Sequence, residues 1–203
     1  MNELIRNIST FLVLAIAISA LAACGDSSAN STNGNTAWKS TANSASKSAG
    51  YPKLASALAD TDIELIDGGG TFKIGERKGK VLMLNIWGTW CGPCRQEMPH
   101  LIEMQAKYKD QGFEVIGLNI GTYEGTPEST EEITKFAAEM KLNYTLARSP
   151  RQATGAFYAI TKQQVVPQTM LVDREGHVRC IFVGGGQRIF DSMKQNLDKV
   201  MAE

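Results

Sequence analysis

Two cysteines are spaced for redox chemistry. Residues 87–94 read WGTWCGPC, so that Gly92 and Pro93 separate Cys91 from Cys94. Two thiols at this spacing can close a disulfide with little strain. They also suit an exchange reaction in which one thiolate attacks the disulfide of a partner and the other thiol then attacks the resulting mixed disulfide. We interpret Cys91 as the nucleophile and Cys94 as the resolving cysteine.

The same thiolates could instead bind a metal ion. A zinc site needs four ligands, and the only histidines of the chain, His100 and His177, are isolated in the sequence. A copper site that uses both thiolates and one histidine stays open as an alternative, although we predict no metal. Hydrolysis by a cysteine nucleophile would need a histidine base held close to it, and the Gly-Pro spacer does not suggest one.

The cysteine pair lies between a strand and a helix. Residues 81–86 (VLMLNI) and 113–120 (FEVIGLNI) are almost continuous apolar runs of strand length, which is typical of strands buried on both faces. A helical segment with Leu101, Met104 and Tyr108 on one stripe lies between them. Strand, helix and strand in this order predict two parallel strands with a right-handed crossover. The cysteines then lie at the carboxyl end of the first strand, where chemistry collects on open α/β sheets.

The start of that helix favours a thiolate. Pro93 suits the first helical position, where its missing N–H would have no partner. The unpaired N–H groups and the positive end of the helix dipole stabilise an anion. We therefore expect the pKa of the Cys91 thiol to lie below its usual value of about 8.5. Cys94, one turn further along, should be more buried and less acidic.

The other elements predict a single α/β domain. A small hairpin over 62–74 precedes the strand–helix–strand unit, and a second helix over 129–141 follows it, beginning with a capping-box pattern. Residues 168–185 read as an antiparallel hairpin, and a final amphipathic helix ends the chain. In the last hairpin, we interpret Cys180 as a buried small apolar residue and not as a catalytic one. We predict a mixed central sheet with flanking helices.

The first 50 residues read as export and anchoring segments. The apolar run 11–23 is too short to span a bilayer and is typical of a secretory signal. It ends in LAAC, which resembles the bacterial lipobox, so we predict a signal peptide over 1–23 and a lipid on Cys24; a plain signal peptide is the alternative. The Ser-, Asn-, Thr-, Ala- and Gly-rich stretch 24–50 predicts a disordered tether, and 51–203 is the folded domain. The domain would then lie in the periplasm or on the outer cell face.

Charge argues against a nucleic-acid partner. The chain has 21 basic and 21 acidic residues, so its net charge is zero. Neither a basic surplus nor a long charge run is present, and no period of a repeat protein is visible.

These motifs resemble the thioredoxin superfamily. The resemblance is carried by WCGPC after an apolar strand, by Pro99 five residues past the second cysteine, and by VVPQT before the final hairpin. It covers roughly residues 60–203 and implies a thioredoxin-like three-layer fold. It also implies a cis peptide bond before Pro167, packed against the disulfide, and a backbone at Val166 that pairs with an extended substrate segment.

A closer match is the TlpA/ResA-like group of membrane-tethered thiol-disulfide oxidoreductases. It rests on LNIWGTWCGPCRQEMP, the leading hairpin and the helical insert after the second parallel strand. The resemblance implies disulfide-containing exported proteins as substrates, such as apocytochrome c or a metal-site assembly protein. It also implies a transmembrane thiol electron donor, and no cofactor besides the redox-active disulfide. Trp90, together with Gly92 and Pro93, would line the contact surface for partners.

We expect the protein to act as a reductant, because the Gly-Pro spacer resembles that of reducing thioredoxins. We also expect it to be a monomer. In an oxidising compartment, such a reductant must be recharged by a membrane electron carrier. An oxidant that donates its disulfide and a copper-binding assembly factor remain alternatives, and peroxidase activity is a lesser one.

A possible proton acceptor lies one helical turn beyond the second cysteine. Cytosolic thioredoxins carry a buried aspartate where this chain has Asn85, which cannot titrate. Glu97 is three residues past Cys94 and therefore lies on the same helix face. Its carboxylate could accept the proton of Cys94, and the resemblance places a functional glutamate here. A solvated surface glutamate is the alternative.

Overall fold

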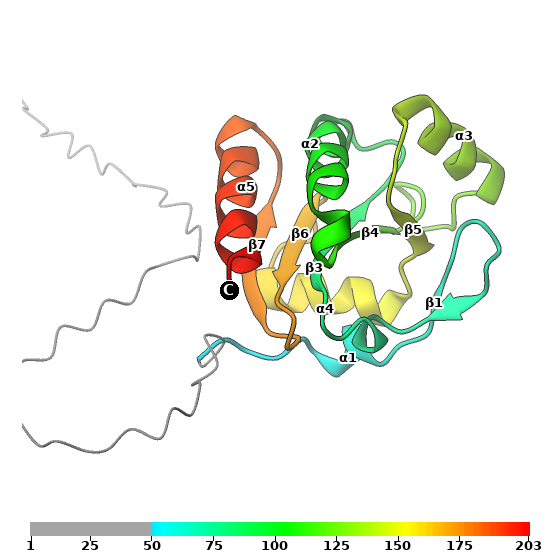
Figure 1. Cartoon of the computed structure of the whole chain (residues 1–203). Coiled ribbons are helices and arrows are strands. Elements are labelled where there is room, and N and C mark those ends of the chain that lie inside the picture. Colours follow the sequence, from blue (N-terminus) through cyan, green and yellow to red (C-terminus); the bar gives the residue numbers. More distant parts are fainter. Residues whose placement is uncertain (1–49) are drawn as a thin grey trace, which may run out of the picture.

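The structure is a computed structural model and describes residues 50–203 (Figure 1). The predicted signal peptide, the predicted lipidation site Cys24 and nearly all of the predicted tether lie outside the described residues. Within residues 50–203, no helix is both long and apolar enough to span a bilayer.

A five-stranded mixed sheet forms the centre, in the order β5-β4-β3-β6-β7. β3 is parallel to β4, and β4 is parallel to β5, whereas β6 is antiparallel to both β3 and β7. Every residue of β3 and β4 is buried, as expected for strands covered by helices on both faces. The strands are β3 (Val81–Trp87), β4 (Phe113–Asn119), β5 (Thr145–Arg148), β6 (Gln168–Val172) and β7 (Val178–Val183).

Helices cover both faces of this sheet, and Figure 1 shows α2, α3 and α5 on one face with α1 and α4 on the other. A two-stranded antiparallel sheet of β1 and β2 precedes β3. The elements outside the central sheet are α1 (Ser56–Ala59), β1 (Ile63–Glu64), β2 (Thr71–Phe72), α2 (Gly92–Tyr108), α3 (Thr130–Met140), α4 (Arg151–Thr161), α5 (Gln187–Met201) and the 3-10 helices Ile74–Glu76 and Lys109–Gln111.

Alternate residues of β3 face two separate apolar clusters. Leu82 and Leu84 pack into the cluster that contains Phe157 of α4. Met83 packs into the cluster that contains Leu101 of α2 and residues of α5. Burial of this apolar surface on both sides fixes the strand that leads into the cysteine pair.

The predicted fold class is confirmed, including the parallel strand–helix–strand unit, the leading hairpin, the last hairpin and the helical insert. The insert begins as predicted, because the Ser129 hydroxyl accepts a hydrogen bond from the Glu132 N–H (3.1 Å) and the Glu132 carboxylate accepts one from the Ser129 N–H (3.0 Å).

The sequence prediction omitted α1, β5 and α4, besides the two short 3-10 helices. β5 has four residues, of which only Ala147 is buried, so it shows no apolar alternation. α4 reads RQATGAFYAIT, and its glycine, threonines and aromatic residues are weak helix formers. Packing against the sheet, and not local propensity, stabilises this helix.

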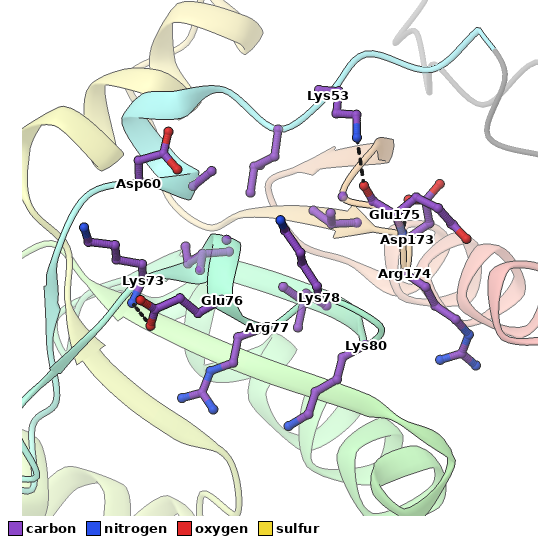
Figure 2. Close-up of a pocket in the computed structure, with 17 residues that line it drawn as sticks. Lys53, Asp60, Lys73, Glu76, Arg77, Lys78, Lys80, Asp173, Arg174 and Glu175 are labelled. Atoms are coloured by element: carbon purple, nitrogen blue, oxygen red, sulfur yellow. Dashed lines mark hydrogen bonds between the residues drawn. The ribbon is translucent and has the colours of Figure 1, made fainter. Parts of the chain in front are cut away.

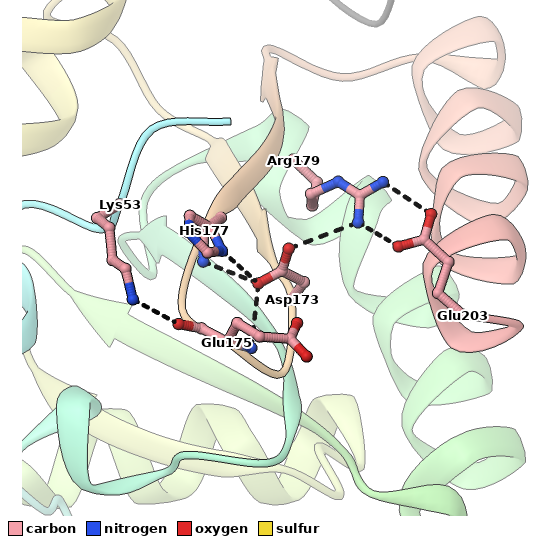
Figure 3. Close-up of polar contacts among 6 residues, drawn as sticks. All are labelled: Lys53, Asp173, Glu175, His177, Arg179 and Glu203. Atoms are coloured by element: carbon pink, nitrogen blue, oxygen red, sulfur yellow. Dashed lines mark hydrogen bonds and ion pairs between the residues drawn. The ribbon is translucent and has the colours of Figure 1, made fainter. Parts of the chain in front are cut away.

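The turn of the last hairpin is held by a buried carboxylate. Asp173 accepts hydrogen bonds from the backbone N–H groups of Glu175 (3.2 Å) and His177 (2.8 Å), and it lies 3.5 Å from Arg179 (Figure 3). Arg179 also contacts Glu203, just past the end of α5. These contacts join the turn to the end of the chain.

Cys180 lies on β7, and it is buried in the cluster under α5. It is not a free thiol, because the described part of the chain contains no free cysteine.

Candidate active site

Cys91 and Cys94 form a disulfide where β3 leads into α2, at the carboxyl edge of the parallel strands. Cys91 is the N-cap of the helix, and its sulfur accepts a hydrogen bond from the Cys94 backbone N–H at 3.2 Å. The helix start therefore points its unpaired N–H groups at this sulfur. Once the disulfide is reduced, the same groups stabilise a Cys91 thiolate.

The two cysteines differ little in exposure in this disulfide state. Cys91 is 3% exposed and Cys94 is 1% exposed, so the predicted contrast in burial is small here. Gly92 and Pro93, between them, are exposed. The Gly-Pro segment is therefore the exposed part of this motif.

The segment before β6 lies beside the disulfide. The Val166–Pro167 peptide bond is cis. Val166 packs against the apolar cluster that contains both cysteines, and the carbonyl of Pro167 accepts a hydrogen bond from Gly184 at 2.9 Å. The end of β7 thereby holds the proline segment next to the reactive pair.

Aromatic side chains form the rim next to Cys91. Trp90 is 40% exposed, and its indole N–H donates to the carbonyl of Gly121 at 2.9 Å. Its ring meets the edge of Tyr123, with centroids 5.3 Å apart, and Tyr123 is 80% exposed. Trp87, by contrast, is fully buried and stacks on Phe136 of α3.

Glu97 is buried, at 1% exposure, so its interpretation as a solvated surface residue is wrong. Its carboxyl accepts hydrogen bonds from the amide of Asn85 (3.0 Å) and from the hydroxyl of Thr169 (2.7 Å). Burial raises the pKa of Glu97 to about 7, although the hydrogen bonds from Thr169 and Asn85 work in the opposite direction. One turn from Cys94, the molecule therefore holds a carboxyl group that can gain or lose a proton near neutral pH.

A second buried carboxylate, which sequence reasoning missed, holds the loop before the cysteines. Glu128 accepts hydrogen bonds from the backbone N–H (3.2 Å) and the hydroxyl (2.8 Å) of Thr89, and from the amide of Asn119 (2.8 Å). Thr89 is two residues before Cys91, and Asn119 ends β4. Glu128 thus links the loop that leads to Cys91 with the end of β4. The polar residue Asn119 at the carboxyl end of β4 was the only sequence signal that pointed to this contact.

A charged cavity of about 290 Å³ lies at the other end of β3 (Figure 2). Its lining includes Lys78 and Lys80, just before β3 begins, and Lys53 near the start of the described chain. Lys80 forms an ion pair with Glu114 at 2.7 Å.

Within residues 50–203, no group of three or more histidine, cysteine or acidic residues is placed to hold a metal ion.

Comparison with known proteins supplies the family. Residues 57–181 match the model of the AhpC/TSA family. The chain belongs to the AhpC/TSA family. This AhpC/TSA chain is 30% identical over 128 residues to thiol-disulfide oxidoreductase ResA of Geobacillus thermodenitrificans, covering 63% of this chain and 67% of that protein. It is 33% identical over 112 residues to ResA of Geobacillus kaustophilus, covering 55% and 59%. The alignments thus span about two thirds or less of these relatives.

Solved structures share the fold of this chain. A structure described as thiol:disulfide interchange protein DsbE from Chlorobium tepidum superposes with a TM-score of 0.60 at 28% identity, covering 74% of this chain and 96% of that one. A secreted thiol-disulfide isomerase from Corynebacterium glutamicum has a TM-score of 0.61 at 20% identity, covering 75% and 86%, which shows the fold alone. The predicted thioredoxin-like fold and the predicted enzyme class, thiol-disulfide oxidoreductase, are confirmed.

Proposed function

We propose that this chain reduces disulfides of exported proteins, outside the cytoplasm, through the Cys91–Cys94 pair. The observation that carries the proposal is the disulfide at the start of α2 with the buried carboxyl of Glu97 one turn behind it. The helix start supports a thiolate at the first cysteine, and the carboxyl supports deprotonation at the second.

The reaction begins with the reduced dithiol. The Cys91 thiolate attacks one sulfur of the partner disulfide, a bond forms between these two sulfurs, and the other partner sulfur leaves as a thiolate that takes up a proton. Glu97 then accepts the proton of Cys94, and the Cys94 thiolate attacks the sulfur of Cys91. The second partner thiolate leaves and is protonated in turn. Two electrons have passed to the partner, and the disulfide seen in the structure is restored.

The partner binds along the surface that surrounds the disulfide. An extended segment pairs with the backbone at Val166, beside Pro167, in the manner of an added strand. Trp90, Gly92 and Pro93 contact the residues that flank the partner cysteine. The exposure of these side chains and the position of the proline segment next to both cysteines support this assignment.

The sequence motifs of the N-terminal segment support a place of action outside the cytoplasm. A lipid on Cys24, followed by the linker 24–50, keeps the domain near a membrane. There a transmembrane thiol carrier returns it to the reduced state. Apocytochrome c and metal-site assembly proteins are the proposed substrates, and the protein acts as a monomer.

The reduction potential of the Cys91–Cys94 pair tests the direction of electron flow. We expect a value near or below about −230 mV, in the range of reducing thiol proteins. To obtain this value, residues 51–203 are equilibrated in defined thiol buffers. The fluorescence of Trp90, next to Cys91, reports the fraction of the pair that is oxidised. The same domain with Cys94→Ser is the control and should show no such transition. A value near about −120 mV would make the protein an oxidant.

A further inference from the structure

The buried side chains of Glu97, Asn85 and Thr169 form a hydrogen-bonded polar compartment behind the disulfide. It lies on the sheet face that α2 and α3 cover, and Figure 1 shows these helices on that face. Glu97 enters it from α2 and is hydrogen-bonded to Asn85 of β3. Asn85 is the direct neighbour of Gly117 in the parallel pairing of β3 with β4. The space over Gly117 is therefore next to the amide that holds the carboxyl.

Two aromatic side chains fill the space over Gly117. A Cβ atom added to this glycine would lie 3.0 Å from the indole nitrogen of Trp87 and 3.1 Å from a ring carbon of Tyr144. The absence of a side chain at Gly117 is what admits both rings. Tyr144, four residues after Met140 at the end of α3 and just before β5, is thus brought to the compartment of Glu97.

Both of these rings carry a buried hydrogen-bond donor without an acceptor. Within residues 50–203, the indole N–H of Trp87 and the hydroxyl of Tyr144 are buried and have no hydrogen-bond partner. Buried polar atoms almost always have a partner. Two unpaired donors in one compartment are the arrangement that stabilises negative charge when it appears there.

Few of the side chains that surround Glu97 in the described part of the chain can carry a negative charge. α2 contributes Cys94, β3 contributes Asn85, β6 contributes Thr169, and the segment before β5 contributes Tyr144. α3 contributes apolar side chains to this face. Burial raises the pKa of Tyr144, and the charge of Glu97 raises it further. The phenol therefore keeps its proton and remains a donor over the working pH range.

The ring of Tyr144 borders open space in which it can rotate, whereas the ring of Trp87 is enclosed. Trp87 is fully buried and stacked on Phe136, with ring centroids 5.4 Å apart. Tyr144 lines a surface cavity of about 740 Å³ between the segment around Leu65 and α3, although its hydroxyl is buried. Its ring thus joins that cavity to the compartment behind the disulfide.

We infer that Tyr144 is a positioning residue for the exchange reaction, whose hydroxyl donates a hydrogen bond to the Glu97 carboxylate once that carboxylate has lost its proton. The inference rests on the proposed function, which makes Glu97 the proton acceptor for Cys94. By stabilising the ionised form of Glu97, Tyr144 keeps the acceptor available at neutral pH. It acts through Glu97 and does not touch the partner.

Tyr144→Phe in the full chain tests this inference, because it removes only the phenol oxygen. Carbon-13 NMR of the glutamate side chains, with Glu97→Gln to assign the signal, follows the titration of Glu97. We expect its pKa to rise by about one pH unit, a tenfold loss of the ionised form below neutrality. The pH–rate profile for disulfide reduction should move by the same amount toward alkaline pH, with the rate at high pH unchanged.

Tyr158→Phe is the matched control, because this phenol packs on the opposite face of the sheet. It should leave the Glu97 titration in place. An unchanged Glu97 titration in Tyr144→Phe would overturn the inference, and so would a shifted titration with an unshifted rate profile. These outcomes are distinct from failure of the proposed function, which would appear as normal reductase activity in Glu97→Gln or after loss of Cys91.

Discussion

Replacement of Cys91 by serine is expected to lower protein-disulfide reduction by about a thousandfold or more, because loss of a nucleophile leaves only the background rate. A serine hydroxyl stays protonated at neutral pH and does not attack a disulfide. It still serves as an N-cap, since Ser accepts from the helix N–H groups as well as the sulfur of Cys91 does. The fold of α2 should therefore survive.

Steady-state reduction of a protein disulfide, with a dithiol as electron source, measures this loss. The thermal unfolding of Cys91→Ser should be compared with that of the reduced parent chain, because the variant also lacks the disulfide. Activity close to that of the parent in a folded variant would show that another group attacks the partner.

Glu97→Gln is expected to slow turnover by about a hundredfold, the lower range for loss of a general base. The amide of glutamine keeps the size of the side chain and an oxygen for Thr169, but it cannot take the proton of Cys94. In the parent chain, the rate of mixed-disulfide resolution should rise with pH through about 7, where Glu97 ionises. Stopped-flow measurement across pH 5 to 9 should show that this step is lost in the variant.

The stability of the same variant provides an independent check of the buried carboxyl. The pKa of Glu97 is about 7 in the folded chain, above the ordinary 4.5. Its contribution to stability is therefore complete below pH 4.5 and is lost as the pH rises to about 7. The difference corresponds to about 3 kcal/mol.

Denaturant unfolding of the disulfide form should accordingly favour Glu97→Gln over the parent by about 3 kcal/mol more at pH 8 than at pH 4. An equal difference in the free energy of unfolding at both pH values would mean that Glu97 titrates normally, and it would remove the basis for its role as proton acceptor.

The sequence predicted those parts of the site that depend on local spacing. Cys91, Cys94 and Glu97 lie within two turns of one helix, so their relation follows from helix geometry alone. The strands β3 and β4 are buried on both faces, and this burial is visible as continuous apolar runs.

The remaining parts depend on contacts between distant segments. Thr169 meets Glu97 from 72 residues away, and Glu128 meets Thr89 from 39 residues away. Tyr144 reaches the same compartment only because Gly117 leaves space for its ring. No periodicity or short motif encodes these pairings. α4, on the sheet face opposite α2, was not predicted because its sequence contains weak helix formers.

The most direct test of the central claim is the identity of the sulfur that bonds to a partner. Cys94→Ser, in its reduced state, should be mixed with a disulfide-bonded test peptide and analysed by mass spectrometry after acid quenching. We predict a stable one-to-one adduct in which the peptide sulfur is bonded to Cys91, because the variant lacks Cys94, the thiol that would release the peptide. The Cys91→Ser, Cys94→Ser double variant should form none at these positions. An adduct through another residue, or no adduct at all, would contradict the account.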